Sequence, residues 1–287
     1  MVRFMISVRT VKKSLFVLFF PFAVVAPVPL MAQIYTAMPS KGMKLTYDQK
    51  PMGQASVECI YRYTRANAKK EKQSQRLILQ ANNKQSKCYS LAEYKRDSVA
   101  NLRGRNNMKV EDFKKLVFTY SNAAVGDQSC YNSREYRDTK KAELTSFVYE
   151  FGPRNIEYTT PLPTVRWNTA HKERVTICDY TCQKATGEFG GRKWTVWFTT
   201  DIPVSSGPWK LGDLPGLILR ASDATGEHSF EAVSIRNAKS TIFWDVFTTQ
   251  KTTAEKARQM SRDKHKNYEQ HERGFGVIQP NYTLLEP

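Results

Sequence analysis

Two strand-like runs flank a turn-rich centre in residues 190–222, and this segment constrains the fold more than any other part of the chain. Side chains alternate along residues 193–201, with one face made of Trp194, Val196 and Phe198 and the other of Thr195, Trp197 and Thr199. A period of two is typical of a half-buried β-strand. The turn signals that follow, and the apolar run at residues 216–221, predict a second strand beyond a loop.

Strands of the same kind recur along most of the chain. Short alternating or apolar runs lie at residues 54–64, 75–81, 114–121, 145–151, 174–181, 216–221, 228–235 and 241–248. Most of these runs are too close together for a helical crossover, so the connections are expected to be antiparallel. The sequence therefore predicts a mostly β fold, with a curved antiparallel sheet that forms an open half-barrel or bowl.

Two segments, residues 90–104 and 252–273, do not fit the strand pattern. The second is rich in Lys, Glu, Ala, Arg and Gln, with Thr253 placed as an N-cap and Gly274 just beyond its end. We expect a C-terminal helix there. Its apolar residues are few, so it should pack at an edge rather than in the core.

The turn-rich centre contains two predicted chain reversals, Gly207-Pro208 and Pro215-Gly216. Proline fixes a φ near −65° and glycine supplies a positive φ, so the second pair suits the centre of a type II turn. One interpretation is that both are structural turns at a corner of the sheet. The other is that the neighbouring Trp209 and Lys210 line the mouth of a cavity.

The candidate ligand-binding residues of this segment are aromatic or basic: Arg192, Trp194, Trp197, Trp209 and Lys210. A charged residue inside a Trp-rich sheet needs a partner, and a structural Arg192–Asp201 pair across a hairpin is the expected one. No catalytic residues are predicted, because the chain has none of the nucleophile, metalloprotease or paired-carboxylate signatures. The sequence thus leans away from an enzyme.

The N-terminus has the layout of a secretory signal peptide. A basic start is followed by an uncharged, mostly apolar run, and Ala32 precedes Gln33 at a suitable cleavage point. We expect a signal peptide at residues 1–32 and a single β-rich domain at residues 33–287, exported to the periplasm or associated with the outer membrane, with no integral span after cleavage. An uncleaved membrane anchor is the alternative.

The formal net charge of +17 favours anionic partners. Export and the dispersed positions of the basic residues argue against nucleic acid. A solvated basic surface is one interpretation of the charge, and an anionic envelope partner is the other. Metal binding is not predicted, because His171, Cys178 and Cys182 fall short of a complete zinc set. No cofactor is predicted.

Five cysteines are candidates for disulfides in an exported chain: Cys59, Cys88, Cys130, Cys178 and Cys182. Because five is odd, at least one thiol is free or pairs between chains. Cys178 and Cys182 are not expected to pair with each other. If residues 175–181 form a strand, residues four apart are about 13 Å apart, beyond disulfide reach.

Several short motifs in one order resemble the GLPGLI family. Its signature corresponds to residues 213–218, with Asp213 in place of the first glycine, and further matches lie at residues 86–90, 158–167, 182–185, 191–192, 197–199, 202–203 and 207–210. The resemblance implies an exported bacterial envelope protein of unknown function, often associated with outer-membrane transport genes. Cysteine is unusual for the family at Cys88 and Cys178, which suggests an extra disulfide between them.

The leading hypothesis is a non-enzymatic envelope or periplasmic binding protein whose ligand is a lipid, glycan or peptide. If it is right, a cavity lined by Trp194, Trp197 or Trp209 should exist, and a closed, filled core there would contradict it. The alternatives are an accessory subunit that docks on an outer-membrane transporter through an exposed apolar patch and an uncharacterised hydrolase.

Overall fold

The computed structural model describes residues 48–67, 69–103, 108–128, 130–149, 155–272 and 284–285. All of them belong to one compact unit, Lys41–Pro287. The predicted signal peptide, its cleavage point and Gly274 lie outside the described residues.

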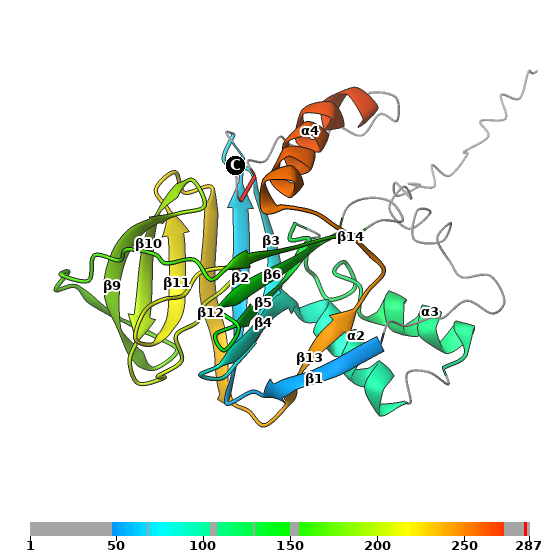
Figure 1. The fold of residues 1–287 in the computed structure, drawn as a ribbon, viewed down its shortest axis with the longest axis horizontal. Coiled ribbons are helices and arrows are strands. Elements are labelled where there is room, and N and C mark those ends of the chain that lie inside the picture. Colours follow the sequence, from blue (N-terminus) through cyan, green and yellow to red (C-terminus); the bar gives the residue numbers. More distant parts are fainter. Residues whose placement is uncertain are drawn as a thin grey trace, which may run out of the picture. The chain divides into compact units, whose positions relative to one another are not determined.

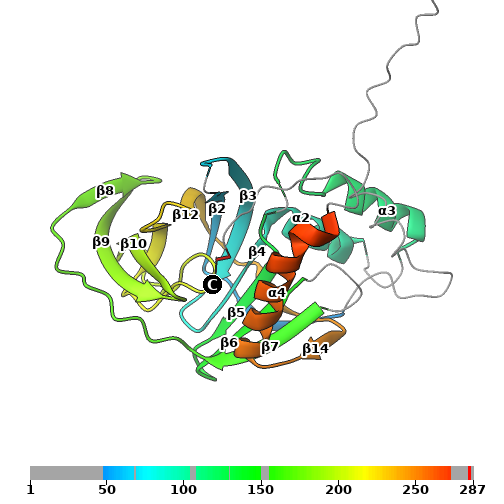
Figure 2. The same cartoon turned by 90° about the horizontal axis from the view of Figure 1, so that it is seen from above.

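A single curved sheet dominates the fold (Figures 1 and 2). Its order is β14-β7-β6-β5-β4-β3-β2-β12-β11-β10-β9-β8, and β1 and β13 form a separate two-stranded ribbon. The strands are β1 (Asp48–Gln54), β2 (Val57–Ala66), β3 (Lys72–Ala81), β4 (Gln85–Ser90), β5 (Ser133–Asp138), β6 (Glu143–Val148), β7 (Asn155–Pro161), β8 (Arg174–Ile177), β9 (Tyr180–Phe189), β10 (Arg192–Thr199), β11 (Leu217–Asp223), β12 (His228–Asn237), β13 (Thr241–Val246) and β14 (Thr249–Lys251).

This architecture confirms the predicted mostly β fold with a curved, unclosed antiparallel sheet and a C-terminal helix. All pairings in the described sheets are antiparallel except that of β14 with β7. The short connections seen in the sequence account for this, since a parallel pair needs a long crossover.

The main hydrophobic core lies on the concave face of the sheet, between β2–β4 and β9–β12. Alternate residues of β2 and β10 point into it, as the sequence predicted, and Tyr61, Trp194 and Val196 are at most 1% exposed. Each fully buried side chain of this size stabilises the fold by about 1.5–3 kcal/mol relative to an exposed one. The periodicity of single strands was therefore sufficient to identify the core face.

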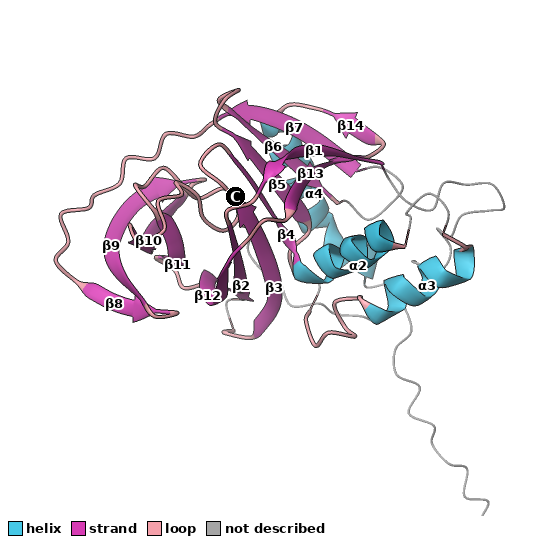
Figure 3. Cartoon of the chain, turned by 90° about the horizontal axis from the view of Figure 1, so that it is seen from below, coloured by secondary structure: helices cyan, strands magenta, loops and turns pink. Residues whose placement is uncertain are grey.

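Helices lie against two other parts of the sheet (Figure 3). Helix α2 (Leu91–Leu102) covers Ile78 and Tyr89 on the outer face, and α3 (Val110–Thr119) packs beside it. Helix α4 (Ala254–Glu272) packs on β7, next to the edge of the sheet. The Thr253 Oγ1 accepts the backbone N–H of Lys256 at 3.2 Å, which confirms the predicted N-cap.

Two predicted strands are wrong. Residues 114–121 belong largely to helix α3, where two acidic residues in the first turn and the packing on α2 outweigh the β-propensity of its Val, Phe and Tyr. Residues 174–181 contain a hairpin, because the chain reverses at Cys178 and Asp179. Both have positive φ values, 48° and 68°, as a tight two-residue turn between antiparallel strands requires.

None of the helices in the described residues has both the length and the apolar character needed to cross a membrane.

All five cysteines lie in the described residues, and all five are free thiols, so the predicted disulfides, including Cys88–Cys178, are not formed. The register of β2, β3 and β4 explains why Cys59 and Cys88 do not form a disulfide. Cys59 and Cys88 both pair with Leu79 from opposite sides, which puts them two strands, about 9.6 Å, apart. A disulfide needs Cα atoms within about 7 Å.

Thiol labelling tests this arrangement. Protein denatured without reductant should react with five equivalents of a thiol reagent, and native protein should react first at Cys178, the one cysteine that is not fully buried. Burial raises the pKa of Cys88 and of Cys130 to about 12, so these thiols hold little reactive thiolate. Cys178→Ser should remove the fast phase. Fewer than five reactive thiols after denaturation would contradict the free state.

Candidate functional site

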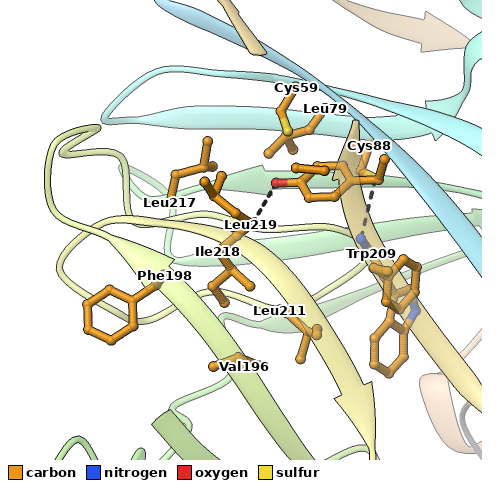
Figure 4. Close-up of a cluster of buried hydrophobic side chains, with 14 of the residues drawn as sticks. Cys59, Leu79, Cys88, Val196, Phe198, Trp209, Leu211, Leu217, Ile218 and Leu219 are labelled. Atoms are coloured by element: carbon orange, nitrogen blue, oxygen red, sulfur yellow. Dashed lines mark hydrogen bonds between the residues drawn. The ribbon is translucent and has the colours of Figure 1, made fainter. Parts of the chain in front are cut away.

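The loop between β10 and β11 folds over the concave face and closes part of the core (Figure 4). The Trp209 N–H donates to Cys88 Sγ at 3.3 Å, and the Ser206 and Ser86 hydroxyls lie 3.0 Å apart. Just after the loop, at the start of β11, the Ile218 carbonyl accepts from the Tyr61 hydroxyl of β2 at 2.6 Å. The turn-rich centre found in the sequence is therefore a cover for the core.

Gly216 does not have the positive φ that a type II turn at Pro215-Gly216 requires, so that prediction is wrong. A different constraint demands glycine. A Cβ at Gly216 would lie 1.9 Å from the Thr199 carbonyl oxygen and 3.0 Å from the Thr200 Cα. The loop can approach β10 this closely only without a side chain.

Asp213, three residues earlier, takes the left-handed conformation, with φ 67°. Aspartate is tolerated there better than most residues. Its Oδ2 accepts the backbone N–H of Val165 at 2.9 Å, and the Trp167 indole N–H donates to the Gly212 carbonyl at 2.9 Å. Asp213 occupies the first position of the GLPGLI-like motif, and its left-handed conformation is one that glycine adopts without strain.

Two of the predicted ligand-binding tryptophans are core residues. Trp194 and Trp209 are 1% and 5% exposed, their ring centroids lie 5.9 Å apart, and Phe189 packs on Trp209 at 5.3 Å. The Trp194 indole N–H is satisfied by the Phe189 carbonyl at 3.0 Å. Packing between the sheet and its covering loop, rather than a solvent-facing wall, is the role that their surroundings show.

Lys210 is also buried. Its Nζ donates to the Tyr158 hydroxyl at 2.7 Å and lies 5.0 Å from the centre of that ring. Arg137 donates to the Lys210 carbonyl at 3.1 Å, and its guanidinium fills the space that a Cβ on Gly212 would take. These contacts fix the loop to β5 and β7.

Arg192 forms a structural ion pair, as expected, but with partners other than Asp201. Its Nη1 lies 2.6 Å from Asp223 and 3.2 Å from Glu227, on the next hairpin of the sheet. Asp201 is exposed in the turn after β10. The register of β10 and β11 places Asp223 opposite Trp194, next to Arg192 on the concave face, and no sequence pattern showed this register.

The outer face of the same strands carries two ordered rows of polar side chains. Each row is a chain of cross-strand neighbours that runs across six strands, from β3 through β2, β12, β11 and β10 to β9. The members are half-buried or exposed, whereas most of their sequence neighbours in the strands point into the core.

Small hydroxyl side chains make up the first row, which we name the hydroxyl row. Its members are Ser74, Thr64, Ser229, Ser222, Thr195 and Thr186. At one end, the Thr186 hydroxyl lies 3.0 Å from His171 Nε2. With strands about 4.8 Å apart, the row is about 24 Å long.

The second row, the Trp197 row, lies beside the first on the same face, two residues away in every strand. Its members are Arg76, Arg62, Glu231, Arg220, Trp197 and Lys184. Trp197 is half-buried between Lys184 and Arg220, whose side chains are 26% and 35% exposed and pair with Glu173 and Glu231. Of the three predicted tryptophans, Trp197 thus belongs to a surface of regular hydrogen-bonding groups.

Sequence reasoning found the separate faces of β2 and β10 but missed the rows. Thr195 and Trp197 were placed on one face, and Arg62 and Thr64 belong to the polar face of β2. A row across strands depends on register, which single-strand periodicity does not contain. Chemically, the rows offer hydroxyl donors and acceptors, an aromatic face and guanidinium groups along one surface.

Sequence reasoning also missed a buried ion cluster under the β1–β13 ribbon. Asp245 accepts from Lys87 Nζ and from the Tyr136 hydroxyl, both at 2.7 Å, and from Arg134. Burial lowers the pKa of Lys87 to about 8, although Asp245 opposes this. Burial alone would raise the pKa of Asp245, but Arg134 and Lys87 hold it below its ordinary value. The cluster ties the ribbon to β4 and β5.

Within the described residues, no group of three or more His, Cys, Asp or Glu side chains could hold a metal ion.

Residues 168–261 match the family model described as N-glycanase peptide, N-terminal domain. The match spans β8 to β14 and the start of α4, and so includes most of both rows. A search of the curated proteins found no match.

Among solved structures, PNGF-II in two space groups is 16% identical to this chain, with TM-scores of 0.48 and 0.46 and 72% of this chain covered. An uncharacterised conserved protein from Thermus thermophilus is 10% identical, with a TM-score of 0.33, 69% of this chain covered and 89% of that chain. The chain spans about a third of the PNGF-II chain, 33% and 32% in the two forms.

Gly216→Ala should strongly destabilise the protein, by about 2 kcal/mol or more, because the new methyl group meets backbone atoms that cannot move away. Urea unfolding measures the change. Gly53→Ala is the matched control, since the nearest atom there is the end of the flexible Gln85 side chain. Equal stability of the two variants would refute the close-approach constraint.

Stability should fall between pH 7 and pH 5 because of His228. Burial, with Arg192 as the next cause, lowers the pKa of His228 from 6.5 to about 4. Between these values the unfolded chain binds the proton and the folded chain does not, so acidification favours unfolding, here by about 2 kcal/mol. His228→Gln should remove most of this slope, and His171→Gln should keep it. Urea unfolding at each pH measures the free energy of unfolding. If its dependence on pH is unchanged in His228→Gln, the assignment to His228 is contradicted.

Proposed function

We propose that the protein is a non-enzymatic, exported binding protein of the bacterial envelope, and that its ligand is an extended glycan lying across the outer face. The observation that carries the proposal is the pairing of the hydroxyl row with the Trp197 row on one six-stranded surface. Core residues and the covering loop fill the concave face, which contradicts the expected cavity lined by Trp194 and Trp209, so the proposal assigns binding to the opposite face.

The chemistry of the two rows suits a sugar chain. Each Ser or Thr hydroxyl can both donate and accept, which matches the alternating donor and acceptor character of sugar hydroxyls. The Trp197 side chain packs against the hydrophobic core and is partly exposed, so it gives an amphipathic surface on which the apolar face of a sugar ring can pack. Glu231 and Glu173 compensate Arg220 and Lys184, so Arg62 and the net charge of +17 are the features that favour an acidic glycan.

The family match supports a carbohydrate ligand. The model that matches residues 168–261 describes an N-terminal domain of an N-glycanase, and this chain would use the corresponding strands for binding without the chemistry. The GLPGLI-like motifs and the N-terminal signal pattern support export to the periplasm or the outer membrane.

A second candidate is an accessory subunit that docks on an outer-membrane transporter. Two large apolar side chains favour it, because Leu102 and Phe118, near the C-terminal ends of α2 and α3, are 88% and 62% exposed. Exposed apolar residues of this size are typical of interaction surfaces when they form a patch.

Isothermal titration calorimetry with polygalacturonic acid as the acidic probe and dextran as the neutral one tests the proposal. We expect the acidic chain to bind more tightly and its affinity to fall as salt is added. Trp197→Ala should weaken binding about tenfold, Trp197→Phe should retain most of it, and the double variant Thr195→Val/Ser222→Ala should weaken it by about threefold.

Leu102→Ala, on helix α2, is the control and should bind as the unaltered protein does. Thermal unfolding of each variant separates a loss of binding from a loss of fold. The proposal is refuted if neither probe binds, or if Trp197→Ala binds as Leu102→Ala does. Co-purification of a membrane transporter that depends on Leu102 and Phe118 would instead support the second candidate.

A further inference from the structure

A separate site lies at the rim of the concave face, where Arg192 begins strand β10. Arg192 shares this face with Trp194 and Val196, at the end of the core. Its side chain is only 9% exposed. A guanidinium held at the border of an apolar core is costly unless its donors are used, so their partners define what the site recognises.

Carboxylates hold one side of this guanidinium in place. Nη1 contacts Asp223 at 2.6 Å and Glu227 at 3.2 Å, and Asp223 is itself fixed by the Thr225 hydroxyl and the backbone N–H of His228. The orientation of Arg192 is therefore set by β11, β12 and the turn between them, independently of any ligand. This is the kind of preorganised group on which binding sites are built.

Main-chain carbonyls from the far end of the protein accept from the remaining donors. Arg192 Nη2 donates to the Leu284 carbonyl at 2.5 Å, and Nε donates to the Leu285 carbonyl at 3.3 Å. The Leu285 side chain packs against the main core cluster. Figure 2 shows this short segment, in red, inside the curve of the sheet.

These contacts recognise general features of a peptide. Two successive carbonyls are present in any extended segment, and the apolar surface selects a side chain such as leucine. The segment that makes the contacts lies 92 and 93 residues from Arg192 in the sequence. Two carbonyl contacts and one apolar side chain are features that another peptide can reproduce.

We infer that the rim around Arg192 is a binding site for an extended peptide with an apolar residue, and that Leu284–Leu285 occupies this site in cis. A peptide of the same chemistry from another protein would bind by displacing the C-terminal segment. Because the tethered segment competes at a high effective concentration, the resting protein is largely closed to such a peptide. The site lies on the opposite face from the two rows, so the inference does not depend on the proposed glycan function.

Fluorescence anisotropy of a labelled synthetic peptide, residues 279–287 of this chain, tests the inference on the full-length protein. The Leu285→Ser protein should bind the peptide about tenfold more tightly than the unaltered protein, because its own segment has lost the apolar contact. Leu102→Ser removes an exposed leucine of helix α2 and should leave the affinity unchanged.

A second measurement keeps the protein constant and changes only the peptide. A probe that carries Ser in place of Leu285 should bind the Leu285→Ser protein about tenfold more weakly than the natural probe. Arg192→Lys in the Leu285→Ser background should weaken the natural probe further, since the single ammonium of lysine lacks the planar fork that reaches both carbonyls while it contacts Asp223. Equal affinity of the two probes, or no gain in the Leu285→Ser protein, overturns the inference. Thermal unfolding confirms that each variant is folded.

Discussion

The close approach of the covering loop to the concave face is the constraint on which most of the structure depends. Gly216 lies against the Thr199 carbonyl, and this contact lets the loop bury Trp209 over the core. The hydrogen bond from Trp209 to Cys88 then connects the loop to β4, and the bond from Tyr61 to Ile218 connects the start of β11 to β2. A methyl group added at Gly216 would push the loop away from the end of β10.

Filling of the concave face determines where function can lie. Trp194 and Trp209 stabilise the core, so the groups that face solvent are those of the opposite face and of the rim. On the outer face, register aligns small hydroxyls in one row and basic residues with Trp197 in the next. At the rim, the carboxylates of Asp223 and Glu227 orient Arg192 toward the carbonyls of the terminal segment. The same alternation of side chains along each strand produces the core and the outer surface.

The two buried ion clusters have different consequences. Asp245, Lys87 and Arg134 satisfy one another under the β1–β13 ribbon, and removing one partner from such a group is costly because it leaves a buried charge unpaired. Their positions join β13, β4 and β5, which are far apart in the sequence. Arg192 also has carboxylate partners, but it keeps two donors for main-chain carbonyls. A buried arginine of this second kind can serve both the fold and recognition.

The sequence by itself determined the class of fold, the core face of β2 and β10, and helix α4 with its Thr253 cap. Each of these depends on local pattern, which short-range sterics and burial impose on neighbouring residues. Only the tertiary structure showed why Gly216 is glycine and that Arg192 pairs with Asp223 rather than Asp201. It also decided that the cysteines are unpaired, that residues 114–121 are largely helical, and that hydroxyl side chains form a row. These features depend on register and on contacts between distant segments, and a one-residue change of register would move every side chain of a strand to the other face.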